Sequence, residues 1–483
     1  MGDGIAETHT GVVVLLSDRA YKVKKPVVTD FLDFSTPAAR ERACVHEVDL
    51  NRRLAPDSYL GVAHFSLPGQ PPEPVIVMRR HPDERRLATL VRRGDDVGAD
   101  LAAIAGVLAG FHAAAERGPR IDDEARVDAV AGRWTENLDE LARYAATTVP
   151  AVSPETVAAA RGLVAGYLAG RADLFGARIA TGRVVDGHAD LLADDIFCLP
   201  EGPAMLDCLE FDDRLRYVDV IDDAAFLAMD LEYLGRPDLA QDFLAEYRSA
   251  SGDDAPESLC HLYIAYRAVV RAKVDCVRVG QGHPEAAEDA RRHLAIALDH
   301  LRRGAVRLVL VGGGPGTGKT TVARGLAEIL GAQVISTDDV RAAMVARGEI
   351  AGRAGVLGEG LYTPENVEAV YREVLQQARA GLSHGRSVIL DGTWADPDDR
   401  DRARSLAADT HAVRTEIACT TTLQSAVARI GTRGPTTSQV TAEIATALAD
   451  RSDDWPDAHR LDTAGPLADT LNEARDICLA ATL

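Results

Sequence analysis

At residues 313–320 the chain reads Gly313-Gly314-Pro315-Gly316-Thr317-Gly318-Lys319-Thr320. This stretch fits the pattern G-x-x-x-x-G-K-[ST], and the β-branched run at 306–311 before it predicts a strand. A helical apolar spacing follows at 321–330. Backbone N–H groups of such a loop surround nucleotide phosphates at a helix N-terminus, where glycines permit close approach. We therefore expect a P-loop that binds ATP or GTP.

Within this loop, Lys319 is expected to reach the phosphates and the Thr320 hydroxyl to hold Mg²⁺. The alternative is a glycine-rich turn that binds nothing. The strand, lysine, hydroxyl and helix together favour nucleotide binding. The predicted nucleotide-binding residues are Gly313, Gly314, Pro315, Gly316, Thr317, Gly318, Lys319, Thr320 and Thr321.

Length and composition describe a globular protein with more than one core. A chain of 483 residues predicts two or three domains, and 46% apolar with 26% charged residues is typical of a globular chain. Lysine and arginine number 53 against 74 acidic residues, which gives a net charge of −21. This balance argues against nucleic acid as a partner, because few cations are present to displace counterions.

The seven cysteines are scattered without a C-x-x-C pair, so we expect buried free thiols instead of metal ligands or disulfides. No basic N-terminal region precedes an apolar stretch, and no long apolar run is present. The sequence therefore predicts a cytoplasmic protein with no membrane partner.

Two lysines near the N-terminus form a second candidate nucleotide site. Strands are predicted at 11–16 and 20–25, and alternation places Lys22 and Lys24 on one face. Glu47 lies in a helical stretch at 36–54. In kinase-like lobes, a strand lysine paired with a helix glutamate holds the α- and β-phosphates of the nucleotide. The predicted strand at 75–78 suits the hinge segment that would lie against the adenine ring. The alternative is a solvated lysine face.

A polar loop follows at 184–197 and contains His188-Ala189-Asp190 and Asp195. Asp207 comes after another apolar run. One Asp that accepts the proton of a hydroxyl, together with two oxygen ligands for Mg²⁺, is the layout of kinase-like phosphotransferases.

With these residues, the part of the chain from residue 1 to about residue 300 resembles the aminoglycoside-phosphotransferase-like kinases. The catalytic loop of these kinases reads H-G-D-x-x-x-x-N. The resemblance implies that Asp190 is the catalytic base and that Asp195 and Asp207 are metal ligands. Ala189 replaces the usual Gly and Asp195 the usual Asn, and no Gly-rich phosphate loop lies between residues 4 and 16. The alternative is a kinase-like shell with little or no activity.

The surrounding helices offer fewer functional residues. His112 lies on an apolar helical stripe, and we interpret it as a core histidine. The acidic run at 207–230 fits either a rim for cations or a solvated face. At 263–274 an apolar stripe adjoins a basic edge.

After the P-loop, a predicted strand at 333–337 leads into Asp338 and Arg341. An Asp at this edge lies across the cleft from the γ-phosphate, so we expect Asp338 to act as base and Arg341 to neutralise substrate charge. The alternative is that Asp338 caps the next helix. Asp391 ends a buried strand at 386–391, which suits a ligand of Mg²⁺ or of the substrate.

Arg429 and Arg433 are four residues apart on one helical face, where they fit a lid over the phosphates. The alternative is two exposed arginines without a role. Together, these features of 305–483 resemble P-loop kinases of small molecules and of polynucleotide 5′-ends. Because it carries both resemblances in this order, the chain is similar to bacterial bifunctional aminoglycoside-phosphotransferase-like and ATP-binding proteins.

We therefore predict a bilobal kinase-like α+β domain over 1–303, with lobes at about 1–78 and 79–303, and a P-loop α/β domain over 304–483. The expected function is ATP- and Mg²⁺-dependent phosphoryl transfer to a small-molecule hydroxyl, with the C-terminal site active. One alternative is a nucleotide-gated regulator with a degenerate N-terminal domain. Another is a polynucleotide 5′-kinase.

Overall fold

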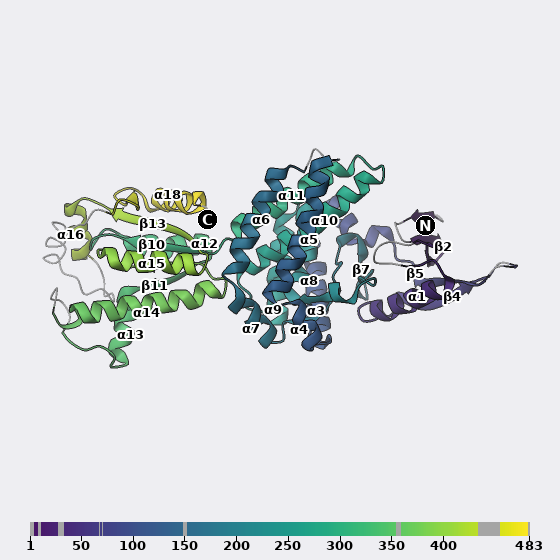
Figure 1. Cartoon of the computed structure of the whole chain (residues 1–483), viewed down its shortest axis with the longest axis horizontal. Helices are drawn as coiled ribbons and strands as arrows, with labels where there is room; N and C mark the ends of the chain where they lie inside the picture. The colour runs from purple at the N-terminus through teal and green to yellow at the C-terminus, as the bar shows by residue number, and fades with distance from the viewer. Residues whose placement is uncertain are drawn as a thin grey trace. The chain divides into compact units, whose positions relative to one another are not determined.

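The chain forms two compact units (Figure 1). The computed structural model describes residues 4–7, 11–27, 33–66, 68–69, 71–147, 152–353, 359–432 and 455–481. Unit 1 comprises Met1–Arg161, Phe175–Ala255 and Leu259–Leu301, whereas unit 2 comprises Gly162–Leu174, Pro256–Ser258 and Arg302–Leu483.

A five-stranded antiparallel sheet with the order β1-β2-β3-β5-β4 opens unit 1. Helix α1 packs on β4 and β5 and contributes Cys44 and Val48 to a core with Tyr59 and Ile76. The strands and helix predicted here are confirmed, and β1 and β4 are additional. The elements are β1 (Gly4–Glu7), β2 (Gly11–Leu16), β3 (Arg19–Lys24), α1 (Pro37–Asn51), β4 (Tyr59–Phe65) and β5 (Glu73–Arg79).

Helices follow this sheet, as predicted, and two short antiparallel strand pairs, β6 with β9 and β7 with β8, lie between them. These strand pairs flank the polar loop that contains Asp190. The elements are η1 (Asp83–Arg85), α2 (Leu87–Arg93), α3 (Gly98–Ala114), α4 (Pro119–Glu124), α5 (Val127–Thr147), α6 (Pro154–Ala169), α7 (Ala172–Ala180), β6 (Val184–Asp186), η2 (Ala193–Asp195), β7 (Ile196–Leu199), β8 (Gly202–Met205), η3 (Asp213–Arg216), β9 (Tyr217–Asp219), α8 (Val220–Tyr233), α9 (Pro237–Ser251), α10 (Glu257–Gly280) and α11 (Ala286–Arg303).

Unit 2 contains a parallel sheet with the order β11-β12-β10-β13-β14. Its central strand β10 is buried along its whole length, and Val309, Ile389 and Ile417 pack with residues of α12. Parallel strands end at one edge, so the P-loop and Asp391 lie at the same edge. The elements are β10 (Arg307–Gly312), α12 (Lys319–Leu330), β11 (Gln333–Ser336), α13 (Thr337–Ala346), η4 (Gly360–Tyr362), α14 (Pro364–Ser383), β12 (Val388–Asp391), α15 (Pro397–Asp409), β13 (Val413–Thr420), α16 (Leu423–Thr432), β14 (His459–Asp462) and α18 (Leu467–Ala480).

These topologies confirm the predicted fold class, an α+β kinase-like part followed by a P-loop α/β part. The seven cysteines are buried and unbridged, as expected. Across the described ranges, no helix is both long and apolar enough to cross a membrane.

Candidate functional site

The P-loop of unit 2 connects β10 to α12 in a conformation that requires glycine. Gly316 has a φ of 78° and Gly318 a φ of 87°, in the left-handed region. A Cβ added to Gly313 would lie 2.4 Å from the backbone oxygen of Cys419, and one added to Gly316 would lie 2.5 Å from that of Ala426. The backbone conformation and the lack of space for a Cβ atom therefore both favour glycine in this loop.

The lysine of the motif lies against its own loop. Lys319 Nζ donates a 3.0 Å hydrogen bond to the backbone oxygen of Gly314, and Thr317 Oγ1 donates to the same oxygen at 2.8 Å. This position keeps the ammonium group beside the backbone amides that would surround phosphates. Contact of Lys319 with nucleotide phosphates stays a prediction.

Thr320 and Asp391 form the other half of this site. The Thr320 hydroxyl donates to Asp391 Oδ2 at 2.7 Å, and Asp391 is only 3% exposed. Burial raises the pKa of Asp391, while the Thr320 hydrogen bond and the charge of Lys319 act in the opposite direction. Oxygen donors of this kind suit Mg²⁺.

These two residues fit Mg²⁺ as part of its ligand set. Among the described residues, no group of three or more His, Cys, Asp or Glu side chains could hold a metal ion. Magnesium commonly keeps water and phosphate oxygens as ligands and needs few from the protein. A hydroxyl and one buried carboxylate are therefore a sufficient protein contribution.

Asp338 and Arg341 form an ion pair on the first turn of α13. Arg341 Nη1 donates to Asp338 Oδ1 at 2.6 Å, and the guanidinium lies 4.7 Å from the ring centre of Tyr362. The N-cap of α13 is Ser336, whose hydroxyl accepts from the Asp338 amide, so the Asp338 carboxylate is not the cap. Arg341 Nε is buried and has no hydrogen-bond partner in the described part of the chain.

Arg429 reaches the P-loop through a residue that the sequence did not single out. Its guanidinium donates to Thr463 Oγ1 at 3.1 Å and to the Thr463 backbone oxygen at 2.6 Å. The Thr463 hydroxyl in turn lies 2.7 Å from the Thr317 backbone oxygen, to which it donates. Thr463 follows β14 without any motif around it. The other predicted lid residue, Arg433, lies outside the described residues.

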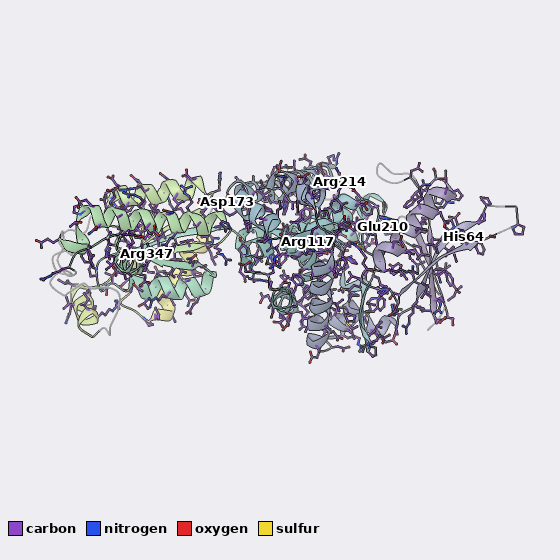
Figure 2. All side chains as sticks on the ribbon, turned by 90° about the horizontal axis from the view of Figure 1, so that it is seen from below. His64, Arg117, Asp173, Glu210, Arg214 and Arg347 are labelled. Carbon is purple, nitrogen blue, oxygen red and sulfur yellow. The ribbon has the colours of Figure 1, made fainter. Side chains whose placement is uncertain are left out.

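In unit 1, Glu47 lies between the two lysines of β3. Its carboxylate pairs with Lys22 Nζ at 2.8 Å and with Lys24 Nζ at 2.5 Å, and Glu47 is fully buried. Lys22 also contacts Asp207 at 2.6 Å, and Lys24 contacts Glu210 at 2.5 Å. Glu210 lies between the sheet and the helices of unit 1 (Figure 2). The predicted lysine–glutamate pair forms, and the solvated-face alternative is wrong.

The carboxylate of Asp223 holds the backbone of the Asp190 loop. It accepts hydrogen bonds from the amides of His188 and Ala189, both at 2.7 Å, and it lies 2.9 Å from His112 Nε2. His112 also lies 2.7 Å from the Tyr247 hydroxyl, which confirms the interpretation of a core histidine. Both His112 and Asp223 are therefore buried and engaged in hydrogen bonds inside unit 1.

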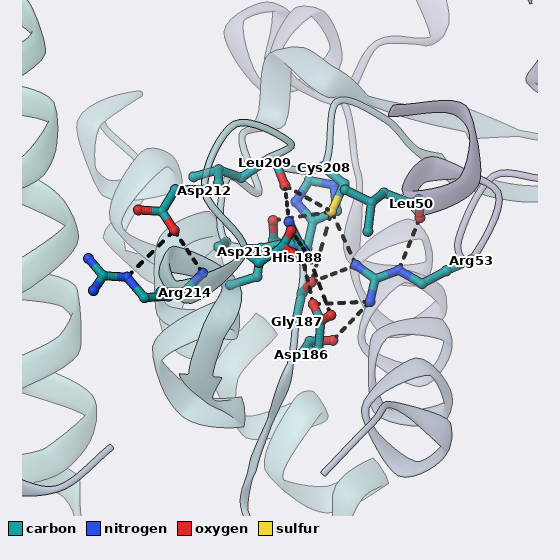
Figure 3. A network of polar contacts seen from close by, with 12 residues as sticks. Leu50, Arg53, Asp186, Gly187, His188, Cys208, Leu209, Asp212, Asp213 and Arg214 are labelled. Atoms are coloured by element: carbon teal, nitrogen blue, oxygen red, sulfur yellow. Dashed lines mark hydrogen bonds and ion pairs between the residues drawn. The ribbon is translucent and has the colours of Figure 1, made fainter. Parts of the chain in front are cut away.

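Arg53 forms hydrogen bonds to the backbone just before Asp190 in this loop (Figure 3). It donates to the backbone oxygens of Asp186 at 3.1 Å and Gly187 at 2.9 Å. Ala189 has a left-handed φ of 67°, a conformation that favours glycine. The strain of an alanine at such a position is on the order of 1 kcal/mol.

The three carboxyls of this site differ in proton affinity. Burial raises the pKa of Asp190 to about 6. Burial and the charge of Asp207 hold the pKa of Asp195 well above its usual value. Burial acts to raise the pKa of Asp207 as well, but Lys22 outweighs it and the pKa is lowered. Asp207 therefore loses its proton more readily than an ordinary aspartic acid, and Asp195 loses its proton less readily.

Comparisons with known proteins find one matching family model and several distantly similar structures. A family model described as an AAA domain matches residues 308–453. Solved structures with some similarity include a sugar kinase from Janibacter sp. (21% identity, 37% of this chain and 99% of that chain, TM-score 0.29). Another is a choline kinase from Cryptosporidium parvum (10% identity, 62% of this chain and 89% of that chain, TM-score 0.40). Similarities this distant do not assign an activity.

Uncharacterized proteins of Mycobacterium tuberculosis and Mycobacterium bovis are far more similar. They are 57% identical to this chain over 478 residues, which is 99% of this chain and 95% of theirs. At this identity over nearly the full length of both chains, the protein belongs to the same family as these mycobacterial proteins and has an AAA domain in its C-terminal part.

Proposed function

We propose that unit 2 transfers the γ-phosphoryl group of ATP to a hydroxyl of a small molecule. The hydrogen bond between Thr320 and Asp391, beside the loop that Lys319 overlies, carries this proposal. A P-loop that only binds nucleotide has no need of an acid and an arginine after another strand that ends at the same edge of the sheet. Asp338 and Arg341 supply both at the end of β11.

In this reaction the acceptor hydroxyl loses its proton to Asp338. A bond forms between the acceptor oxygen and the γ-phosphorus, and the bond from that phosphorus to the oxygen of ADP breaks. Lys319 and Arg429 stabilise charge on the phosphates, and Arg341 turns from Asp338 toward a negative group of the acceptor. Bound Mg²⁺ would neutralise charge on the β- and γ-phosphates.

Unit 1 is a second candidate centre, because Lys22, Glu47 and Asp207 are already in contact. In this centre, Lys22 would bind the α- and β-phosphates, and Asp195 with Asp207 would hold Mg²⁺. Asp190 would accept the proton of the hydroxyl. Its carboxylate has no hydrogen bond or ion pair with any described residue, so it is available to an acceptor.

The test measures ATP turnover by the wild type, Lys319→Ala and Asp190→Ala, each with sugars, aminoglycosides and nucleosides as acceptors. Loss of acceptor-dependent turnover in Lys319→Ala alone is the expected result. Arg324→Ala is the matched control, because Arg324 is exposed on the same helix α12. Partial loss in both variants would show two working centres.

Two results would favour the alternatives. ATP binding without any acceptor-dependent turnover would identify a nucleotide-gated regulator. Salt-sensitive binding of an oligonucleotide, with phosphate transfer to its 5′-hydroxyl, would identify a polynucleotide kinase. The net charge of −21 makes the second result the less expected one.

A further inference from the structure

One face of helix α10 lies against the loop that contains Asp190. Arg267 of this helix donates a 3.2 Å hydrogen bond to the backbone oxygen of Ala189. It also forms two hydrogen bonds to Asp222, at 2.7 Å and 3.0 Å. Arg267 is 5% exposed, so these contacts use its guanidinium in the interior of unit 1. Its role is to hold the loop.

Arg271 lies one helical turn after Arg267, on the same face of α10. It is half-buried, yet its guanidinium makes no hydrogen bond or ion pair with any residue that the structure describes. Other arginines of unit 1 behave differently: Arg178 contacts Asp219 and Asp253, and Arg216 contacts Asp186. Arg271 therefore retains free donors in a place where water is partly excluded.

The charge of Arg271 acts on two carboxyls without contacting either. It lowers the pKa values of Asp190 and of Asp230, in both cases against the stronger effect of burial. Asp230 is already engaged, because one of its oxygens accepts from the Ala193 amide at 2.8 Å. The geometry that supports a role for Arg271 is its place one turn after Arg267 on the helix face that contacts the Asp190 loop.

We propose that Arg271 binds an anionic group of the acceptor whose hydroxyl faces Asp190. The acceptor class is an alcohol that carries a carboxylate or a phosphate. Guanidinium binds both anions through paired N–H donors, and a partly dry site strengthens this contact. This inference rests on unit 1 as a second phosphoryl-transfer centre and names its substrate class.

The reaction at this centre makes and breaks the same kinds of bond as the reaction proposed for unit 2. The acceptor hydroxyl gives its proton to Asp190, its oxygen bonds to the γ-phosphorus of ATP, and the bond between that phosphorus and ADP breaks. Arg271 takes no part in these bond changes. It fixes the distance between the anionic group and the hydroxyl, and it disfavours a cationic acceptor at the same position.

The test uses the full chain with Lys319→Ala, which removes the P-loop lysine of unit 2. Calorimetry measures the binding of Mg²⁺ with a non-hydrolysable ATP analogue and then of four probes: glycerate, glycerol 3-phosphate, glycerol and choline. Arg271→Gln removes the charge, and Arg271→Lys keeps it without the paired donors. Arg278→Gln is the matched control, because Arg278 is 42% exposed on the same helix and pairs with Asp275.

Binding of an anionic probe at least tenfold tighter than glycerol and choline is expected. Arg271→Gln should abolish this preference, Arg271→Lys should keep part of it, and Arg278→Gln should keep all of it. If glycerate is preferred, the anion is a carboxylate, and if glycerol 3-phosphate is preferred, it is a phosphate.

The experiment distinguishes failure of the anionic acceptor from failure of unit 1 as a phosphoryl-transfer centre. If unit 1 binds the nucleotide but shows no preference for an anionic probe, the anionic acceptor is wrong and the centre stands. If Arg271→Gln keeps the preference, Arg271 is not the residue that binds the anion, and the proposal is overturned at this point. If the nucleotide does not bind in the Lys319→Ala background, the centre and the acceptor class are both wrong. Unchanged thermal midpoints in the variants would exclude unfolding as the cause.

Discussion

The hydroxyl of Thr320 and the carboxylate of Asp391 are 2.7 Å apart, although 71 residues separate them in the chain. The register of the sheet explains this contact. β10 and β12 are parallel neighbours with Val311 opposite Asp391, so the P-loop after β10 begins beside that carboxylate. Two motifs that are distant in sequence thereby become one candidate metal site.

Asp391→Asn should weaken the response of ATP turnover to Mg²⁺. The amide keeps the size of the side chain but lacks the charge that attracts a cation, so the Mg²⁺ concentration for half-maximal turnover should rise about tenfold or more. A titration of Mg²⁺ at fixed ATP measures it. Asp398→Asn, at an exposed position of α15, is the control. An unchanged Mg²⁺ dependence would rule out Asp391 as a ligand.

Gly316→Ala should distort the P-loop, whereas Gly314→Ala should be tolerated by the folded chain. A Cβ at 316 would lie 2.5 Å from the backbone oxygen of Ala426, but one at 314 meets only the Thr317 side chain at 3.8 Å. We expect unit 2 to lose about 2 kcal/mol of unfolding free energy in Gly316→Ala and under about 0.5 kcal/mol in Gly314→Ala. Urea unfolding measures both, and equal losses would contradict the loop geometry.

Asp223→Ala should destabilise unit 1 strongly. It removes the acceptor of two backbone amides and the partner of His112, all in the interior. Leaving buried donors without a partner should reduce the unfolding free energy by about 3–5 kcal/mol. Hydrogen exchange in α8 and α10 measures it, and Asp242→Ala on the exposed face of α9 is the control. A loss as small as in the control would show that Asp223 does not hold this loop.

The sequence alone predicted the parts of the sites that lie in motifs. The P-loop glycines, Lys319 and Thr320 have fixed spacing, and the alternation of β3 placed Lys22 and Lys24 on one face. Strands β13 and β14 were not predicted, although β13 pairs with the central strand. Their sequences, VRTEIACT and HRLD, do not alternate polar and apolar residues and carry no turn signal as clear as the P-loop.

Contacts made by tertiary packing could not be read from sequence spacing. Thr463 joins Arg429 to the P-loop only because β14 pairs with β13 in the same sheet. Glu210 contacts Lys24 across 186 residues. Asp338 and Arg341 are only three residues apart, yet this spacing did not predict that they form an ion pair with each other.

Asp190→Asn should make unit 1 more stable at pH 8 and inactive. Burial raises the pKa of Asp190 from 3.8 to about 6, so ionisation opposes folding. The free-energy cost of ionising Asp190 in the folded state is absent well below pH 4, where the carboxyl is neutral in the folded and the unfolded chain. It is complete well above pH 6, where the carboxyl is ionised in both. Because each pKa unit corresponds to about 1.4 kcal/mol and the shift is about two units, the gain at pH 8 should be about 3 kcal/mol.

The urea dependence of hydrogen exchange in α8 and α10, measured at pH 5 and pH 8, tests this gain in stability. The advantage of Asp190→Asn should shrink at pH 5, since the wild-type carboxyl then carries a proton for most of the time. Asp242→Asn should show no such change, because Asp242 is exposed on α9. Turnover at the unit 1 centre, measured with an alcohol that carries a carboxylate or a phosphate, should rise with pH and reach half its maximum near pH 6, as a base must lose its proton. Equal stability of the two proteins at both pH values would show that Asp190 ionises as freely in the folded chain as in the unfolded one.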